Sequence, residues 1–249
     1  MTAVTPDLHL RLLGSFELRL QGEVVPVTIG SQRLVAFLTL RDVLLTRSYV
    51  AGVLWPDVPT ARANANLRAG LWRLPRACRS LVDVSAYHLR LAVGVTVDFH
   101  HSVELAERLL EHSGRGDGSD LGVAARSQLS SDLLPTWYDD DWVVVERERY
   151  HQLRLHALEA LCERLVAVGR YGEAVDAGLA AVCAEPLRES AHRVLIRAHM
   201  AEGNHAEAGR QYELCRRLLR HEVGVEPSPQ LRALISGAPL PLVSSVTPA

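Results

Sequence analysis

Lysine is absent from the 249 residues, so arginine alone supplies the 27 fixed positive side-chain charges. This absence excludes enzymes that work through a Schiff-base lysine, and it excludes P-loop ATPases, whose phosphate loop ends in GK[ST]. The chain also lacks the GxSxG motif of serine hydrolases and the HExxH motif of zinc proteases. We therefore expect a protein without enzymatic activity and without a cofactor.

Cysteine is scarce, and long apolar runs are missing. The four cysteines, Cys78, Cys162, Cys183 and Cys215, stand far apart without a CxxC pair or zinc-ligand spacing, so we expect buried, reduced thiols and no metal site. No apolar run approaches the roughly 20 residues needed to span a bilayer. The N-terminus lacks the basic start and apolar block of a secretory signal. The expected location is the cytoplasm, with no membrane partner.

The charge changes sign near residue 97. Residues 1–97 carry 11 arginines and 6 acidic residues, whereas residues 98–249 carry 16 arginines and 23 acidic residues. A basic part followed by an acidic part suggests a nucleic-acid contact in the first and a protein contact in the second. Differences of this size also arise by chance in two-domain proteins, so the charge alone does not decide between these interpretations.

The beginning of the chain predicts a small sheet followed by helices. Residues 8–29 alternate apolar and polar positions, which is typical of antiparallel strands with one buried face. A helix is predicted over residues 31–45, with Ser31 as its N-cap. A shorter helix over residues 47–57 stops at Pro56. This order places two helices before the segment that carries most of the arginines.

A third helix carries the candidate DNA-binding side chains. Thr60 is its predicted N-cap, and the buried stripe is predicted to consist of Leu67, Leu71, Leu74 and Cys78. The opposite side and its flanks present cationic, amide, aromatic and small side chains: Arg62, Asn66, Arg68, Ala69, Trp72, Arg73 and Arg76. Arginine and asparagine on a helix can contact base edges and phosphates in the major groove.

A hairpin is predicted directly after this helix, over residues 81–93. Sheet, three helices and hairpin are the order of a winged helix-turn-helix domain, an α+β fold. A solvated helix surface is the alternative interpretation of the arginines, but the following wing favours DNA contact. Pro75 kinks the third helix or ends it by Leu74, so Arg68 and Arg73 are the principal candidates.

Beyond residue 97 the pattern predicts helices throughout, giving a mostly α protein with a small β part. Setting GRYGEAV (169–175) over GNHAEAG (203–209) aligns glycine, glutamate and alanine at a spacing of 34 residues, the tetratricopeptide period. Stacked helix pairs of this kind form a concave surface that binds protein segments. Ordinary antiparallel helices with small residues at their contacts are the alternative. We expect residues 236–249 to form a flexible tail.

The run DDDW, residues 139–142, raises the possibility of a metal site. Three successive carboxylates are more often a solvated helix start, because acidic side chains are stabilised near the positive end of the helix dipole. We expect the second arrangement.

Eight segments carry a resemblance to a known family. They are LLGSFELRLQGEVVPV, SQRLVAFLTL, LWPD, NLRAGLWRLPRA, YHLRL, DDDWVVVERERYHQLRLHALEALCERLVAVGRYGEAV, EPLRESAHRVLIRAHMAEGNHAEA and GVEPSPQLRAL. In this order they resemble the Streptomyces antibiotic regulatory protein (SARP) family. The resemblance implies an OmpR-type winged-helix DNA-binding domain over residues 1–97 and a tetratricopeptide-like bacterial transcriptional activation domain over residues 98–235.

The resemblance also implies a function and a set of DNA-binding positions. It implies a sequence-specific transcriptional activator that binds direct repeats in promoter DNA, associates with itself there and contacts RNA polymerase through its helical-repeat domain. The matching positions are Asn66, Arg68, Ala69, Trp72 and Arg73 in the third helix and Tyr87, His88 and Arg90 in the wing. Pro75 and His88 depart from the family pattern, which more usually has a basic or polar helix former and an arginine there. These departures support an alternative, a tetratricopeptide-like protein-protein adaptor with a degenerate DNA-binding domain.

Overall fold

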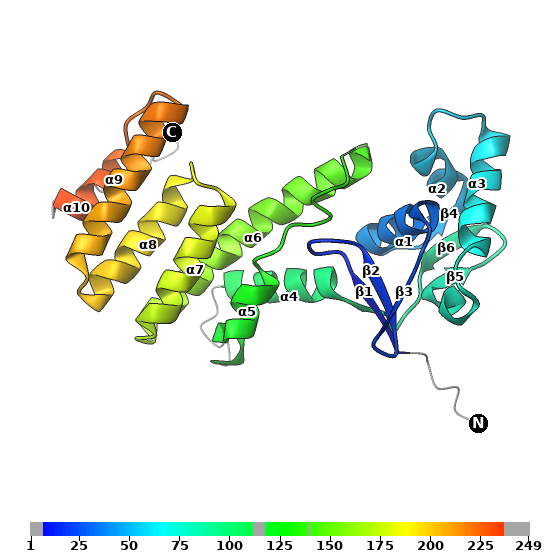
Figure 1. The fold of residues 1–249 in the computed structure, drawn as a ribbon, viewed down its shortest axis with the longest axis horizontal. Helices are drawn as coiled ribbons and strands as arrows, with labels where there is room; N and C mark the ends of the chain where they lie inside the picture. Colours follow the sequence, from blue (N-terminus) through cyan, green and yellow to red (C-terminus); the bar gives the residue numbers. More distant parts are fainter. Residues whose placement is uncertain (1–6, 112–117, 139, 237–249) are drawn as a thin grey trace, which may run out of the picture. The chain divides into compact units, whose positions relative to one another are not determined.

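The computed structural model describes residues 7–111, 118–138 and 140–236. It confirms the predicted fold class, mostly α with small sheets near the N-terminus and an all-α region after them (Figure 1). Contacts divide the chain into a first unit, Met1–Val103 with Ser131–His151, and a second unit, Glu104–Ser130 with Gln152–Ala249. The boundary predicted at residue 97 stays a prediction. The predicted flexible tail lies, apart from Ser236, outside the described residues.

The first unit contains two small sheets. The strands of the first sheet, in the order β3-β2-β1-β7, are β3 (Glu23–Val25), β2 (Glu17–Leu20), β1 (Leu8–Arg11) and β7 (Thr96–Val97). β1 pairs antiparallel with β2 and parallel with β7. Alternate residues such as Leu8, Leu10 and Leu18 point into the core, which confirms the strand pattern predicted from the sequence. The second sheet consists, in order, of β4 (Leu45–Thr46), β6 (His88–Leu91) and β5 (Val82–Val84).

Three helices pack between and beside these strands in the first unit (Figure 1): α1 (Ile29–Arg41), α2 (Arg47–Leu54) and α3 (Thr60–Trp72). α1 is the central element, because its Leu34, Phe37 and Leu38 are fully buried. Sheet, three helices and the β5–β6 hairpin give the predicted winged-helix order.

Both predicted helix caps are wrong. The N-cap of α1 is Thr28, and Ser31 lies inside the helix, where its hydroxyl donates a 2.7 Å hydrogen bond to the Gly70 carbonyl of α3. Thr60 is the first residue of α3, after Pro59 at the N-cap, and no side chain caps this helix. Ser31 is fully buried, so its polar group needs a partner and joins two helices instead of ending one.

The segment Ser131–His151 packs with the first unit. Arg33 of α1 forms an ion pair with the carboxylate of Asp140. Its Nε donates to both carboxylate oxygens at 3.0 Å, and its Nη2 donates to Oδ1 at 2.6 Å. The indole of Trp142 donates to the same carboxylate at 3.0 Å and packs edge-on against Phe37. The prediction of a solvated run of carboxylates is therefore wrong for Asp140, which is buried because it neutralises an arginine. Asp139 lies outside the described residues.

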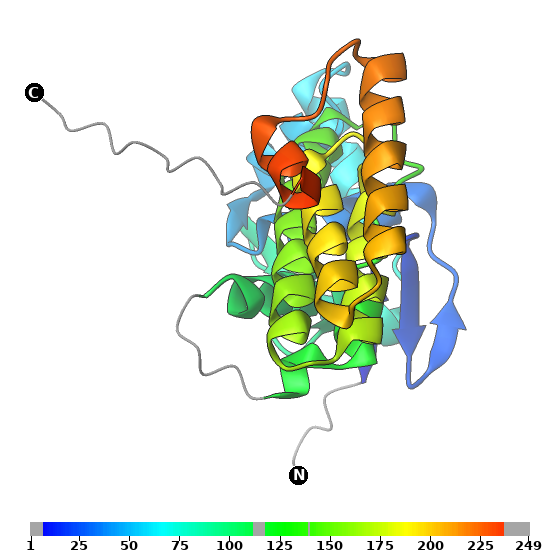
Figure 2. The ribbon, with the colours of Figure 1, turned by 90° about the vertical axis from the view of Figure 1, so that its left-hand side faces the viewer.

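Over its described residues, the second unit consists of helices and short turns. Two helices belong to it in part, α4 (Asp98–Leu110) and α6 (Asp141–Ala167), and the others are η2 (Gly118–Leu121), α5 (Val123–Gln128), α7 (Tyr171–Ala184), α8 (Glu189–Glu202), α9 (His205–Glu222) and α10 (Pro229–Ser236). α7 packs on α8 and α8 on α9, so successive helices stack as the repeat pattern predicts (Figure 2). Gly178 allows the first contact to be close, since a Cβ there would lie 3.1 Å from that of Leu195.

The cysteines are free thiols, as predicted, but one of them is exposed. Cys78, Cys162 and Cys215 are buried, whereas Cys183 is exposed near the end of α7, so the prediction of burial is wrong for this residue. Burial raises the pKa of Cys162 to about 12 and that of Cys215 to about 11, which keeps these two thiols protonated. No helix within the described ranges has the length and apolar character of a membrane span.

A buried histidine links two helices of the second unit. His192 of α8 is fully buried, with Nε2 2.9 Å from the Pro186 carbonyl and Nδ1 2.7 Å from Nε2 of Gln211 on α9. This arrangement suits a neutral ring that donates from Nε2 and accepts at Nδ1. Burial lowers the pKa of His192 below its ordinary value of 6.5.

Acid should therefore destabilise the second unit. Below pH 6.5, the ordinary pKa of histidine, the unfolded chain binds a proton at residue 192 that the folded chain does not, so the free energy of unfolding falls. Above that pH both states are neutral and the effect vanishes. Urea unfolding followed by far-ultraviolet circular dichroism across this pH range measures it. The variant His192→Gln should lose this part of the pH dependence, and parallel profiles for the two proteins would contradict the assignment.

Candidate nucleic-acid interface

The packing of α3 on α1 determines which side of α3 faces outward. Ala63, Leu67 and Gly70 are the buried residues of α3. Gly70 lies against α1, where a Cβ would contact the Gly30 carbonyl and the Leu34 side chain at 3.7 Å. The Ser31 hydrogen bond reaches the same turn of α3. These contacts leave the opposite side of the helix open to solvent.

That open side has unneutralised arginines. Arg62, Arg68 and Arg73 are exposed, as is Trp72 with 75% of its surface accessible, whereas Asn66 and Ala69 are partly buried. Within the described residues no carboxylate lies within 4.0 Å of the guanidinium groups of Arg62, Arg68, Arg73 or Arg76. Because each guanidinium keeps its donors free, the surface can bind phosphate oxygens or guanine edges in bidentate fashion.

Pro75 lies outside the third helix. α3 ends at Trp72, and the N–H of Arg73 donates to the carbonyls of Ala69 and Leu71. Pro75 then stands at the N-cap of η1 (Arg76–Leu81), a 3₁₀ helix. The helix is thus finished by Leu74, one of the two outcomes expected from the proline. Arg76 is exposed on η1, beyond the end of the helix.

Leu74 and Cys78 of the predicted stripe are buried although they lie beyond α3, whereas Leu71 is only partly buried. The apolar spacing thus continues into η1. Arg79 of η1 donates to the Trp72 carbonyl at 3.3 Å, which satisfies an orphan acceptor at the helix end.

The wing is the β5–β6 hairpin, which turns at Ser85 as predicted. The Ser85 hydroxyl accepts from the backbone N–H of His88 at 2.9 Å, and Tyr87 is 76% exposed at the turn. His88 is partly buried and pairs with Thr46 of β4. Arg90 is exposed but forms a 2.8 Å ion pair with Asp83. Exposed pairs of this kind are weak, so Arg90 can exchange the carboxylate for a phosphate.

Arg47 is a basic residue of this region that the sequence interpretation missed. It is the first residue of α2, and its backbone N–H donates to the Tyr87 carbonyl at 2.9 Å while its guanidinium reaches the Ser85 carbonyl at 3.4 Å. These bonds tie the start of α2 to the turn of the wing. The signal in the sequence was an arginine directly after Thr46, the N-cap of α2.

The described residues contain no cluster of histidine, cysteine or acidic side chains that could hold a metal ion. The side chains that this surface offers are arginine guanidinium, amide and aromatic groups. Arginine, amide and aromatic side chains together bind anions and the edges of flat rings such as nucleic-acid bases.

Comparison with known proteins identifies relatives for most of the chain. The family model described as Bacterial transcriptional activator domain matches residues 97–237. Regulatory protein AfsR of Streptomyces coelicolor is 30% identical over 238 residues, which cover 91% of this chain and 24% of that protein. Regulatory protein AfsR of Streptomyces griseus is 30% identical over 219 residues. The chain thus spans about a quarter of the length of these relatives.

Two mycobacterial proteins are also similar. Transcriptional regulatory protein MoaR1 of Mycobacterium tuberculosis is 25% identical, with 91% of this chain and 78% of that protein covered. A solved structure of Mycobacterium tuberculosis EmbR in complex with a low-affinity phosphopeptide superposes with a TM-score of 0.73 at 21% identity, covering 95% of this chain and 67% of that chain. The EmbR likeness extends over both units and concerns the fold.

Proposed function

Because the chain belongs to the Bacterial transcriptional activator domain family and to its SARP-type regulators, we propose that it regulates transcription by binding promoter DNA through α3. The observation that carries this proposal is the row of exposed arginines on and just after α3, none of them neutralised by a described carboxylate. In winged-helix proteins the equivalent helix enters the major groove. The names of the relatives, regulatory and transcriptional regulatory proteins, support the same function.

The proposed contacts follow from side-chain chemistry. Arg68 on α3 and Arg73 at its C-cap, both exposed, would contact guanine edges or phosphates, and Asn66 would contact adenine. Ala69 and Trp72 offer apolar surface to thymine methyl groups. The remaining proposed contacts are with the phosphate backbone, from Arg62, Arg76, His88 and Arg90.

The helical-repeat domain, residues 98–235, would act as the activating part. We propose that it contacts RNA polymerase and a neighbouring copy of the protein bound to the next of two direct repeats. Its stacked helices support this role, since such repeats present extended surfaces to proteins. The winged-helix domain would comprise residues 1–97, and the segment Ser131–His151 packs with it.

Competition between duplexes tests the proposal. A labelled duplex from the protein's own upstream region should be displaced by the same unlabelled duplex at far lower concentration than by a scrambled one, since base contacts separate specific from non-specific binding. Equal displacement by both duplexes would remove sequence-specific regulation and favour the adaptor function.

A further inference from the structure

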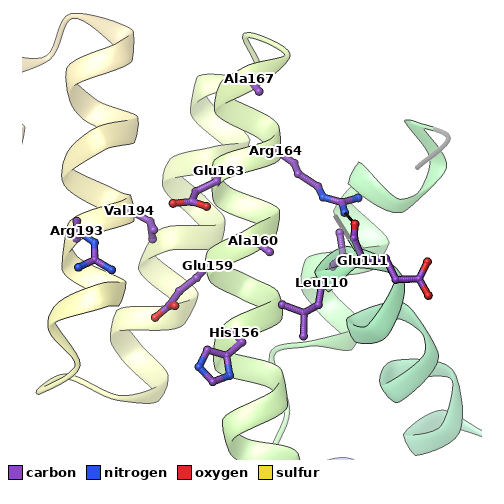
Figure 3. A pocket seen from close by; sticks show the side chains of 11 residues that line it. Leu110, Glu111, His156, Glu159, Ala160, Glu163, Arg164, Ala167, Arg193 and Val194 are labelled. Carbon is purple, nitrogen blue, oxygen red and sulfur yellow. Dashed lines mark hydrogen bonds between the residues drawn. The ribbon is translucent and has the colours of Figure 1, made fainter. Parts of the chain in front are cut away.

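A groove follows the exposed side of α6 in the second unit, between α4 and α8 (Figure 3). Its volume is about 690 Å³. Small and aliphatic side chains form its floor, among them Leu110 of α4, Ala160 and Ala167 of α6, and Val194 of α8. Alanines on a helix let another chain approach closely, so the groove is shaped for a polypeptide segment.

Two of the three glutamates that line the groove have arginine partners. Glu159 accepts from Arg188 Nε at 2.7 Å and from the Ser190 hydroxyl at 2.6 Å, and Glu163 pairs with Arg197 at 3.3 Å. Glu111 also lines the groove, but its carboxylate points away from α6 (Figure 3). Glu159, whose pair with Arg188 is largely buried, therefore contributes little attraction for a cationic partner.

Two arginines on opposite sides of the groove keep their charge unneutralised. Arg164 of α6 donates to the backbone carbonyls of Glu111 at 2.7 Å and Arg108 at 3.3 Å, which are neutral acceptors. Arg193 of α8 is partly buried. Across the part of the chain that the structure describes, no carboxylate lies within 4.0 Å of either guanidinium. Both positive charges thus face a groove with an apolar floor.

We propose that this groove binds an acidic segment of a partner protein, laid along α6 with aliphatic side chains on Ala160 and Leu110 and carboxylates on Arg164 and Arg193. Burial of the aliphatic groups supplies the attraction. The two ion pairs, between the partner's carboxylates and Arg164 and Arg193, supply selectivity for an acidic segment. A basic segment would instead place its positive charges next to those of the two arginines. This inference does not depend on DNA binding by α3, which uses other residues.

Peptide binding to the full-length protein tests the proposal. The probe is a short fluorescein-labelled peptide of glutamate and leucine, with leucines at helical spacing, and binding is followed by fluorescence anisotropy. We expect saturable binding that Arg193→Ala weakens about tenfold, which corresponds to about 1.4 kcal/mol. Ala160→Trp, which fills the floor, should abolish binding.

The controls separate this result from a general effect of charge. Arg217→Ala removes an exposed arginine of α9 that has no ion pair within the described residues, and it should leave affinity unchanged. A peptide with lysine in place of each glutamate should not bind. Equal affinity of the wild type, Arg193→Ala and Ala160→Trp, or equal binding of the lysine peptide, would overturn the proposal. Operator binding by the same variants is expected to be unchanged, so failure here leaves the DNA-binding function intact.

Discussion

Replacing Arg68 and Arg73 together by alanine should lower the affinity for operator DNA by about 100-fold or more. Each arginine that contacts a base edge or a desolvated phosphate contributes about 1–3 kcal/mol. Both side chains are exposed, and neither has a carboxylate partner within the described residues. Their removal therefore costs no intramolecular ion pair, and folding should be unaffected. Fluorescence anisotropy with the upstream duplex is the measurement.

A matched double variant separates local contact from loss of charge. Arg217→Ala with Arg232→Ala removes the same two charges from exposed positions of α9 and α10 that lack ion pairs among the described residues. This variant should bind the operator nearly as well as the wild type. If the two double variants lose the same affinity, or if neither loses any, α3 is not the DNA-reading helix.

The second large effect concerns the stability of the first unit. Asp140→Ala should lower its free energy of unfolding by about 3–5 kcal/mol, the usual cost of removing one partner of a buried ion pair. The change leaves the Arg33 guanidinium without its carboxylate and the Trp142 indole without its acceptor. Arg33 lies on α1, the helix that also holds α3 through Ser31, so DNA binding should weaken at elevated temperature.

Tryptophan fluorescence during urea unfolding measures this change in the first unit. All four tryptophans, Trp55, Trp72, Trp137 and Trp142, belong to that unit, so the second unit does not contribute to the signal. Asp141→Ala is the control, because Asp141 is the exposed neighbour in the same acidic run. It should cost at most about 1 kcal/mol through the helix dipole. Equal unfolding curves for the two variants would exclude Asp140 as a structural partner of Arg33.

Local periodicity predicted most elements of the first unit. The alternation over residues 8–29 predicted β1, β2 and β3 of the first sheet but not β7. The stripe that begins at Leu67 predicted one buried residue of α3, while Ala63 and Gly70 complete its buried face. Both patterns depend on neighbours within one element, which a sequence displays directly. The helix end was ambiguous because the same apolar spacing continues through Leu74 and Cys78 into η1.

Partners distant in the chain could not be predicted. Arg33 and Asp140 stand 107 residues apart, and nothing in DDDW distinguishes a buried carboxylate from solvated ones. The sequence favours a cap role for Ser31 because the acceptor of its hydroxyl, the Gly70 carbonyl, is 39 residues away. At the candidate site the sequence identified the arginines of α3, but it could not show that Arg90 is paired with Asp83 or that Arg47 ties α2 to the wing.

The salt dependence of the affinity for DNA tests most directly whether the arginines on and after α3 bind the DNA backbone and bases. The logarithm of the association constant for the upstream duplex should fall linearly with the logarithm of salt concentration, with a slope of about −0.9 for each phosphate contacted. Because four arginines on and after α3 lack a carboxylate partner among the described residues, we expect a slope between about −2 and −5 per bound chain. The slope should be less steep in the Arg68→Ala, Arg73→Ala variant. A slope near zero, or no binding at low salt, would contradict the account.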